Sequence, residues 1–281
     1  MTTVCHKQKN MSKKIIIPSA PIKKEESAQA FTDFVQIVHR LRKECPWDRE
    51  QTQESIRHLL IEEAYETLEA IEKADWLEVK KELGDLFLHI VFHAVMAQEE
   101  DRFTLKDVIL SISEKLIRRH PHVYGEIIAA DAQMVLENWE KIKQGENPKK
   151  TSVLDGVPKH LPGLLQAHRI QEKAAGVGFD FPNPDQAFLK VQEEIKEYSE
   201  KLSNPNCTSE EKEDELGDVL FSIVNHARLN GLVAESAIRR TNQKFISRFR
   251  YIEKRIKELE KSLEDITLEE MDKYWDEAKR A

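Results

Sequence analysis

The chain has 281 residues, 33% of them charged and 40% hydrophobic, and a formal net charge of −8. This length fits one or two domains, and the acidic balance argues against a general binder of nucleic acid or of anionic membranes. The three cysteines are far apart and odd in number, which favours a reducing cytoplasm over a disulfide framework. No apolar run approaches the roughly 18 residues that span a bilayer.

Apolar residues spaced three and four apart predict a series of helices. We expect residues 1–28 to form a flexible tail. Helices should then cover residues 30–43, 53–70, 77–98, 104–119 and 131–143. In the second half they should cover residues 163–175, 185–202, 208–229, 234–260 and 267–280. The sequence shows no sustained alternation of apolar and polar residues, so we expect no strands.

A cluster of turn-forming residues separates the two halves. Residues 145–162 contain Gly145, Asn147-Pro148 and Asp155-Gly156, a composition typical of a linker. We therefore predict an all-α fold of two tandem helical-bundle domains, residues 29–144 and 163–281.

An acidic signature of the form EExxE followed by ELGD occurs once in each half. The first copy is Glu62-Glu63-Ala64-Tyr65-Glu66 with Glu82-Leu83-Gly84-Asp85. The second copy is Glu193-Glu194-Ile195-Lys196-Glu197 with Glu215-Leu216-Gly217-Asp218. Recurrence at matched spacing indicates a duplicated unit, in which two copies are too few for a solenoid.

The signature places carboxylates three apart on two successive helices, where they share a face. If the helices pack antiparallel, the two pairs converge, and Gly217 would allow a close approach. Four facing carboxylates repel one another unless a cation lies between them, and an all-oxygen ligand set favours Mg²⁺. A solvated acidic face is the competing interpretation for any single pair.

Basic and aromatic residues also recur in both halves at a spacing of four. The pairs are Lys115 with Arg119, Lys244 with Arg248, Trp139 with Lys143, and Trp275 with Lys279. Lys and Arg on one helix face can bind a triphosphate, and Trp can stack on a base, although Trp is more often a packing residue.

Other constellations are weaker. His89 and His93 have a spacing that can serve zinc, but the sequence offers no evident third ligand, so we favour packing or hydrogen bonding. The Glu-x-x-His motif of di-iron bundles is absent, as are a P-loop and a Rossmann fingerprint.

At these residues the chain resembles the MazG family of nucleoside triphosphate pyrophosphohydrolases, over nearly everything from about residue 30 to 281. The resemblance is carried by both acidic copies and by further motifs, which are Cys45-Pro46-Trp47-Asp48, residues 115–123, residues 163–175 and Val177-Gly178-Phe179-Asp180-Phe181. One departure is Phe181, where a tryptophan is expected.

The resemblance implies an all-α fold, a homodimer and Mg²⁺-dependent cleavage of a nucleoside triphosphate, with Mn²⁺ as a substitute ion. The implied metal-binding and catalytic residues are Glu194, Glu197, Glu215 and Asp218. The implied nucleotide contacts are Lys190, Lys244, Arg248, Trp275 and Lys279. A second metal site is implied at Glu63, Glu66, Glu82 and Asp85, although Leu59 stands where the second copy has Lys190.

We therefore expect a cytoplasmic enzyme that hydrolyses nucleoside triphosphates to the monophosphate and pyrophosphate, removing non-standard or excess nucleotides. Two alternatives remain open at this point. One is a narrow-substrate relative acting on dUTP or phosphoribosyl-ATP, and the other is a non-enzymatic nucleotide-binding scaffold. We expect no nucleic-acid or membrane partner.

Overall fold

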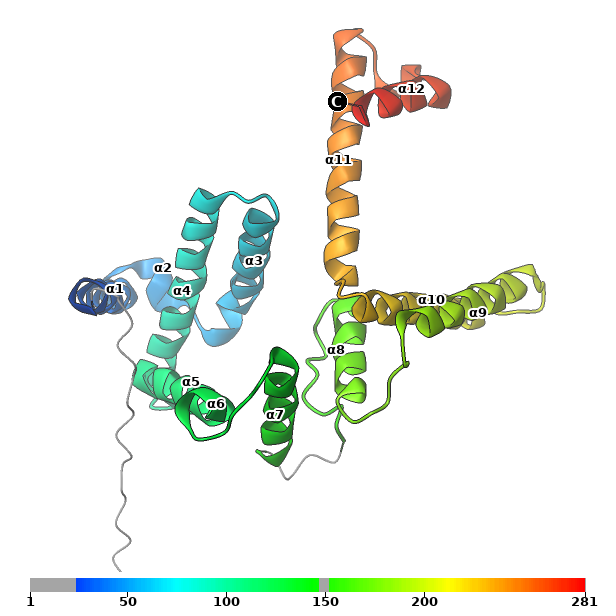
Figure 1. The fold of residues 1–281 in the computed structure, drawn as a ribbon. Coiled ribbons are helices and arrows are strands. Elements are labelled where there is room, and N and C mark those ends of the chain that lie inside the picture. Colours follow the sequence, from blue (N-terminus) through cyan, green and yellow to red (C-terminus); the bar gives the residue numbers. More distant parts are fainter. Residues whose placement is uncertain (1–23, 147–151, 281) are drawn as a thin grey trace, which may run out of the picture. The chain divides into compact units, whose positions relative to one another are not determined.

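The computed structural model describes residues 24–146 and 152–280, and every regular element within them is a helix (Figure 1). The first seven helices are α1 (Lys24–Glu44), α2 (Pro46–Glu50), α3 (Gln53–Glu72), α4 (Trp76–Glu99), α5 (Leu105–Arg119), α6 (Pro121–Tyr124) and α7 (Ala132–Gly145). The remaining elements are α8 (Gly163–Ala175), α9 (Pro184–Ser203), α10 (Ser209–Leu229), α11 (Ala234–Glu258), the 3₁₀ helix η1 (Leu263–Asp265) and α12 (Leu268–Ala278). The predicted all-α fold is confirmed.

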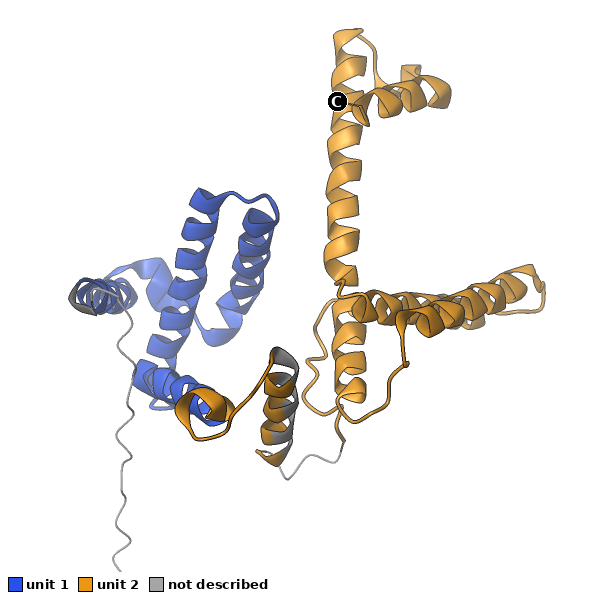
Figure 2. Ribbon diagram, in the orientation of Figure 1, with its two compact units in different colours: residues 1–118 blue, residues 119–281 orange. Residues whose placement is uncertain are grey.

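Helix α1 begins at Lys24, inside the stretch expected to be a tail, and the remainder of that stretch lies outside the described residues. The chain divides into compact units of residues 1–118 and 119–281 (Figure 2), so α6 and α7 fall in the second unit rather than the first.

The core of the first unit forms where α1, α3 and α4 pack together. Val38 of α1, Ile56 of α3 and Val91 and Phe92 of α4 are all buried in one cluster. Helices α3 and α4 are joined by a short turn and run antiparallel as a hairpin (Figure 1). This hairpin carries the first acidic copy on its two facing helices.

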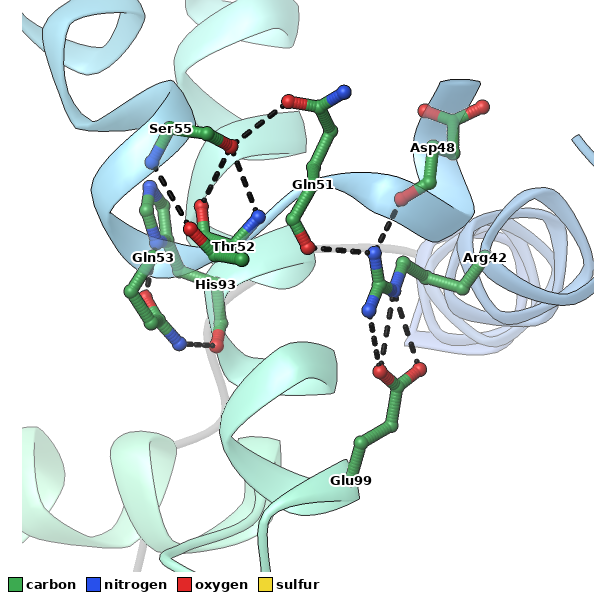
Figure 3. Close-up of polar contacts among 8 residues, drawn as sticks. All are labelled: Arg42, Asp48, Gln51, Thr52, Gln53, Ser55, His93 and Glu99. Carbon is green, nitrogen blue, oxygen red and sulfur yellow. Dashed lines mark hydrogen bonds and ion pairs between the residues drawn. The ribbon is translucent and has the colours of Figure 1, made fainter. Parts of the chain in front are cut away.

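Arg42 fixes the chain between α1 and α3 (Figure 3). Its guanidinium donates to the backbone carbonyls of Asp48 and Gln51 and pairs with the carboxylate of Glu99 at 2.6 Å. The next residue, Thr52, caps α3 by accepting a hydrogen bond from the Ser55 backbone at 3.2 Å. The start of α3, and thus the register of its carboxylates, is set by these bonds.

The second unit contains the matching hairpin. Helices α9 and α10 pack along each other, and Thr208 starts α10 through a capping box with Glu211. Gln171 of α8 donates to the carbonyl of Phe221 at 2.8 Å, which attaches α8 to α10. At the end of the chain, α11 and α12 enclose a smaller core around Ile252 and Ile256.

The described helices were also compared with the length and apolarity of a membrane-spanning helix. Within residues 24–146 and 152–280, none combines the length and apolarity that crossing a bilayer demands.

Candidate metal centre and substrate site

The α9–α10 hairpin brings three of the four predicted carboxylates together. One oxygen each from Glu194, Glu215 and Asp218 lie within 4.8 Å of one another, and Glu194 is only 6% exposed. Glu197, the fourth predicted ligand, is exposed and lies outside this group. The repeated signature therefore produces a compact acidic cluster, as its spacing predicted, from three of the four carboxylates.

The α3–α4 hairpin forms the corresponding cluster from Glu63, Glu66 and Glu82, again within 4.8 Å. Glu82 is 2% exposed, which makes it one of the most deeply buried side chains of the described chain. Here Asp85 is the residue outside the tight group. Each half thus brings together three carboxylates of its quartet, but the outlying member differs.

Mutual repulsion is visible in the first cluster. Burial and the charges of Asp85, Glu66 and Glu82 raise the pKa of Glu63 above its ordinary value. Burial, with the charge of Glu82, also raises the pKa of Glu66. The pKa of Glu82 is lowered instead, because Lys81 donates to its Oε1 at 2.9 Å. These carboxylates are held close at an electrostatic cost that a bound cation would remove.

A lysine already faces the second cluster. Lys190 Nζ lies 2.5 Å from Oε1 of Glu194 and 3.0 Å from Oε1 of Glu193, and these two bonds raise the pKa of Lys190. In the first half Leu59 stands at this place, and Lys81 supplies the positive charge from α4 instead. The two clusters therefore receive their counter-charge from opposite helices of the hairpin.

The other residues predicted to contact nucleotide gather on α11 and α12. The Arg248 guanidinium lies over the Trp275 ring at 5.4 Å, and Trp275 packs against Phe245 with ring centroids 5.0 Å apart. Lys279 pairs with Asp276 at 2.8 Å. In the part of the chain that the structure describes, no ion pair joins Lys244 or Arg248 to the acidic cluster. Arg248 and Trp275 are thus in contact with each other, whereas the partner of Lys279 is a neighbour in sequence.

The first half repeats the Arg-over-Trp arrangement. The Arg119 guanidinium lies over the Trp139 ring at 5.2 Å and pairs with Glu146 at 2.5 Å. Trp139 also meets His120 edge-on, with ring centroids 5.0 Å apart. The recurring basic and Trp pairs thus share a contact as well as a spacing, which explains part of their recurrence by packing.

Gly217 does not serve a close helix approach. A Cβ added at Gly217, or at Gly84 in the first copy, would meet no atom within 4 Å. The expectation that this glycine lets the helices come together is wrong, because the hairpin leaves open space at both positions.

The two histidines of α4 have different surroundings. His93 contacts the Gln53 side chain through Nδ1, and its carbonyl accepts from Gln53 Nε2 at 2.9 Å (Figure 3), in line with a hydrogen-bonding role. His89 is 8% exposed, and its Nε2 faces Glu63 Oε1 at 3.9 Å. Burial lowers the pKa of His89, against the raising effect of Asp85. Only His89 faces the acidic cluster.

The motif around Phe181 lies beside a half-open cavity of about 450 Å³. Its lining is mainly apolar and includes Phe179, Phe181 and Phe221. Asp180 pairs with Arg228 of α10 across this region. Sequence reasoning did not single out Arg228, and the only signal was its position ten residues after Asp218 on the same helix.

Comparison with known proteins supports one interpretation of these clusters. The MazG nucleotide pyrophosphohydrolase domain matches twice, at residues 51–124 and 183–252, so each match contains one carboxylate hairpin. The chain is 42% identical over 258 residues to the nucleoside triphosphate pyrophosphohydrolase/pyrophosphatase MazG of Thermotoga maritima, covering 91% of this chain and 98% of that protein.

Two further relatives extend the comparison. The chain is 41% identical over 249 residues to the nucleoside triphosphate pyrophosphohydrolase of Escherichia coli K12, covering 87% of this chain and 95% of that protein. It is 44% identical over 263 residues to the uncharacterized protein YabN of Bacillus subtilis, covering 92% of this chain but 54% of that longer protein. Two domain matches and nearly full-length relatives give one conclusion: the chain belongs to the MazG family and is a nucleoside triphosphate pyrophosphohydrolase.

Proposed function

We propose that this enzyme hydrolyses nucleoside and deoxynucleoside triphosphates to the monophosphate and pyrophosphate, with Mg²⁺ held in the second half. The ligands we assign are Glu194, Glu197, Glu215 and Asp218. The observation that carries the proposal is the convergence of three of these carboxylates from α9 and α10 within 4.8 Å.

The donor set fits Mg²⁺, which prefers oxygen ligands and retains sites for water and phosphate oxygens. Glu197 lies one turn after Glu194 on the same face of α9. Among the described residues no ion pair holds the Glu197 side chain, which is exposed, so a change of rotamer can add it to the ligand set. When bound, the ion neutralises phosphate charge and orients an attacking water.

The remaining work falls to the protein's own side chains. One carboxylate of the cluster positions the water or accepts its proton. Lys190, Lys244 and Arg248 bind phosphate oxygens and stabilise the charge that develops as the anhydride bond breaks. Trp275 and Lys279 complete the nucleotide contacts. Support for these assignments comes from the resemblance and from the Arg248–Trp275 contact.

We also propose a cytoplasmic homodimer. Large apolar side chains are exposed on the helices that carry the site, among them Leu189 of α9, Leu220 of α10 and Phe245 of α11. Exposed apolar side chains on these helices are surface that an interface between two copies would cover. Sedimentation velocity over a range of concentrations tests the assembly, and a monomer at all of them contradicts it.

The activity is tested by incubating the protein with Mg²⁺ and a panel of NTPs and dNTPs, with dUTP and phosphoribosyl-ATP included. We expect pyrophosphate and the monophosphate from several substrates. Release of orthophosphate contradicts the reaction, and turnover of dUTP or phosphoribosyl-ATP alone identifies the narrow-substrate alternative. Reaction in ¹⁸O-labelled water then locates the phosphorus that water attacks.

The metal assignment is tested with Glu197→Gln and Asp218→Asn. Both variants should lose turnover while far-ultraviolet circular dichroism shows unchanged helicity. If both remain active, the proposed ligand set is wrong.

A further inference from the structure

We propose that the first half contains a second phosphate-binding site, formed by Arg119 and Trp139, and that the carboxylate of Glu146 occupies it in place of a nucleotide. The carboxylate thereby keeps this site closed in the intact chain. The proposal rests on the phosphate-binding role proposed above for Arg248, and it extends that role to the matching arginine of the other half.

The arginine and the tryptophan have the same geometry in both halves. The guanidinium carbon of Arg119 lies 5.2 Å from the centre of the Trp139 ring, and that of Arg248 lies 5.4 Å from the centre of the Trp275 ring. This contact engages the flat face of the guanidinium and leaves its N–H edge available for an anion. A capacity to bind phosphate in the second half should therefore exist in the first half as well.

The two arginines differ in what their N–H edge contacts. Arg119 Nε donates to Oε1 and Oε2 of Glu146 at 3.1 and 3.2 Å, and its Nη2 donates to Oε2 at 2.5 Å. The two side chains are only 15% and 18% exposed. Carboxylate and phosphate oxygens bind the same edge of a guanidinium, so Glu146 takes the place of a phosphate group. By contrast, so far as the structure describes the chain, no carboxylate pairs with Arg248.

Helix α7 holds Glu146 in this position. The backbone N–H of Glu146 donates to the Ile142 carbonyl at 3.2 Å and closes the last turn of the helix. Trp139 lies seven residues earlier, which is two turns away on the same face. One helix therefore supplies both the ring against the guanidinium and the carboxylate at its edge. A negative charge at a helix C-terminus is unfavourable, and the pairing with Arg119 offsets that cost.

A nucleotide can reach Arg119 only by displacing this carboxylate. Because the fold holds Glu146 in place, it competes with free nucleotide as an intramolecular ligand. The chain should therefore bind nucleotide through the second half, although the acidic signature and the Arg-over-Trp contact both occur twice. Removing the charge of Glu146 while keeping its shape should open the first half to a triphosphate.

The test measures binding of α,β-methylene-ATP, which resists cleavage between its α and β phosphorus atoms, to the full-length protein by titration calorimetry with Mg²⁺ present. Arg248→Met should weaken binding in the second half. Adding Glu146→Gln to Arg248→Met should restore affinity by about 10-fold or more, and adding Arg119→Met as well should remove that gain. Glu126→Gln, which removes an exposed charge between α6 and α7, is the matched control and should change affinity by less than about twofold.

The absence of a gain from Glu146→Gln, or a gain that survives Arg119→Met, overturns the proposal. If Arg248→Met binds as tightly as the unmodified protein, the proposed role of Arg248 fails instead. The stoichiometry of Glu146→Gln alone then decides, because it should rise from one to two nucleotides per chain. Circular dichroism checks the helicity of each variant, and Glu146→Asp, whose shorter side chain weakens the pair, replaces a Glu146→Gln variant that does not fold.

Discussion

Lys190 Nζ lies 2.5 Å from Glu194 Oε1, so the acidic cluster of the second half already holds one positive charge next to its most buried carboxylate. The first half has no lysine at this place, because Leu59 occupies it. The ammonium lowers the repulsion among the carboxylates and also competes with a cation for the same oxygen.

Replacing Lys190 by methionine should therefore strengthen Mg²⁺ binding and weaken nucleotide binding. Mg²⁺ should bind more tightly in the absence of substrate, because the competing charge is gone, while KM for the nucleotide should rise about 10-fold through loss of a charged phosphate contact. Calorimetry and steady-state kinetics measure the two. Lys196→Met, which removes an exposed lysine of the same helix, should change neither.

The two acidic clusters can be compared at matched positions. Glu215→Gln should reduce kcat by about 10²-fold or more, because it removes an assigned metal ligand of the catalytic half. Glu82→Gln, the same change in the first half, should leave kcat within about twofold of the unmodified enzyme. Equal losses in both variants would show that both halves contribute to turnover.

The basic pair on α11 is assigned to phosphate binding. Lys244→Ala and Arg248→Ala should each reduce kcat/KM by about 10- to 100-fold, the effect of losing one or two hydrogen bonds to a charged group. Lys257→Ala, on the same helix and exposed, is the control. Because Arg248 also lies over Trp275, near-ultraviolet circular dichroism is needed to show that the Trp environment survives.

Arg42 and Arg40 lie two residues apart on α1, and their substitution compares a largely buried arginine with an exposed one. Arg42→Met should lower the free energy of unfolding by about 2–3 kcal/mol, because the carbonyls of Asp48 and Gln51 lose their donor in a largely buried setting. Arg40 forms an exposed pair with Glu44, so Arg40→Met should leave the free energy of unfolding nearly unchanged. Urea denaturation followed by circular dichroism measures both.

The raised pKa of Glu63 predicts a pH effect on the metal-free protein. The folded state binds this proton more tightly than the unfolded chain, so its contribution to stability is greatest at low pH and is lost as pH rises from the ordinary glutamate range through the raised pKa. Glu63→Gln should then raise the melting temperature at neutral pH. The gain should vanish below about pH 4, where glutamate is protonated in both states.

The matched variant is Glu62→Gln, one residue earlier and exposed on α3. Its gain at neutral pH should be clearly smaller than that of Glu63→Gln. Equal gains would mean that overall negative charge, rather than the buried cluster, sets the effect.

Helix positions were predictable because their causes are local. Periodic apolar residues, Pro46 after the first helix and the caps at Thr52 and Thr208 act within a few residues, so α3 and α10 begin where the sequence placed them. Convergence of Glu194 with Glu215 and Asp218 followed from spacing and an antiparallel hairpin. The division of the chain at Arg119 did not follow, because it depends on which helices contact one another.

The features that sequence reasoning missed depend on contacts between distant residues. Nothing near His89 in the sequence indicates that Glu63, 26 positions earlier, faces its ring at 3.9 Å. The role of Arg228 likewise depends on Asp180, which lies 48 residues away. The open space at Gly217 could not be predicted from the ELGD motif, because it depends on the separation of two helices.

The contacts of α1 show that the core of the first unit extends beyond the stretch matched by the family domain. The first domain match begins at residue 51, yet Val38 fills the core against Val91 and Phe92, and Arg42 anchors the approach to α3. A fragment cut at residue 51 would expose that core and lose the anchor. An autonomous first half is therefore expected to need α1 as well as the matched stretch.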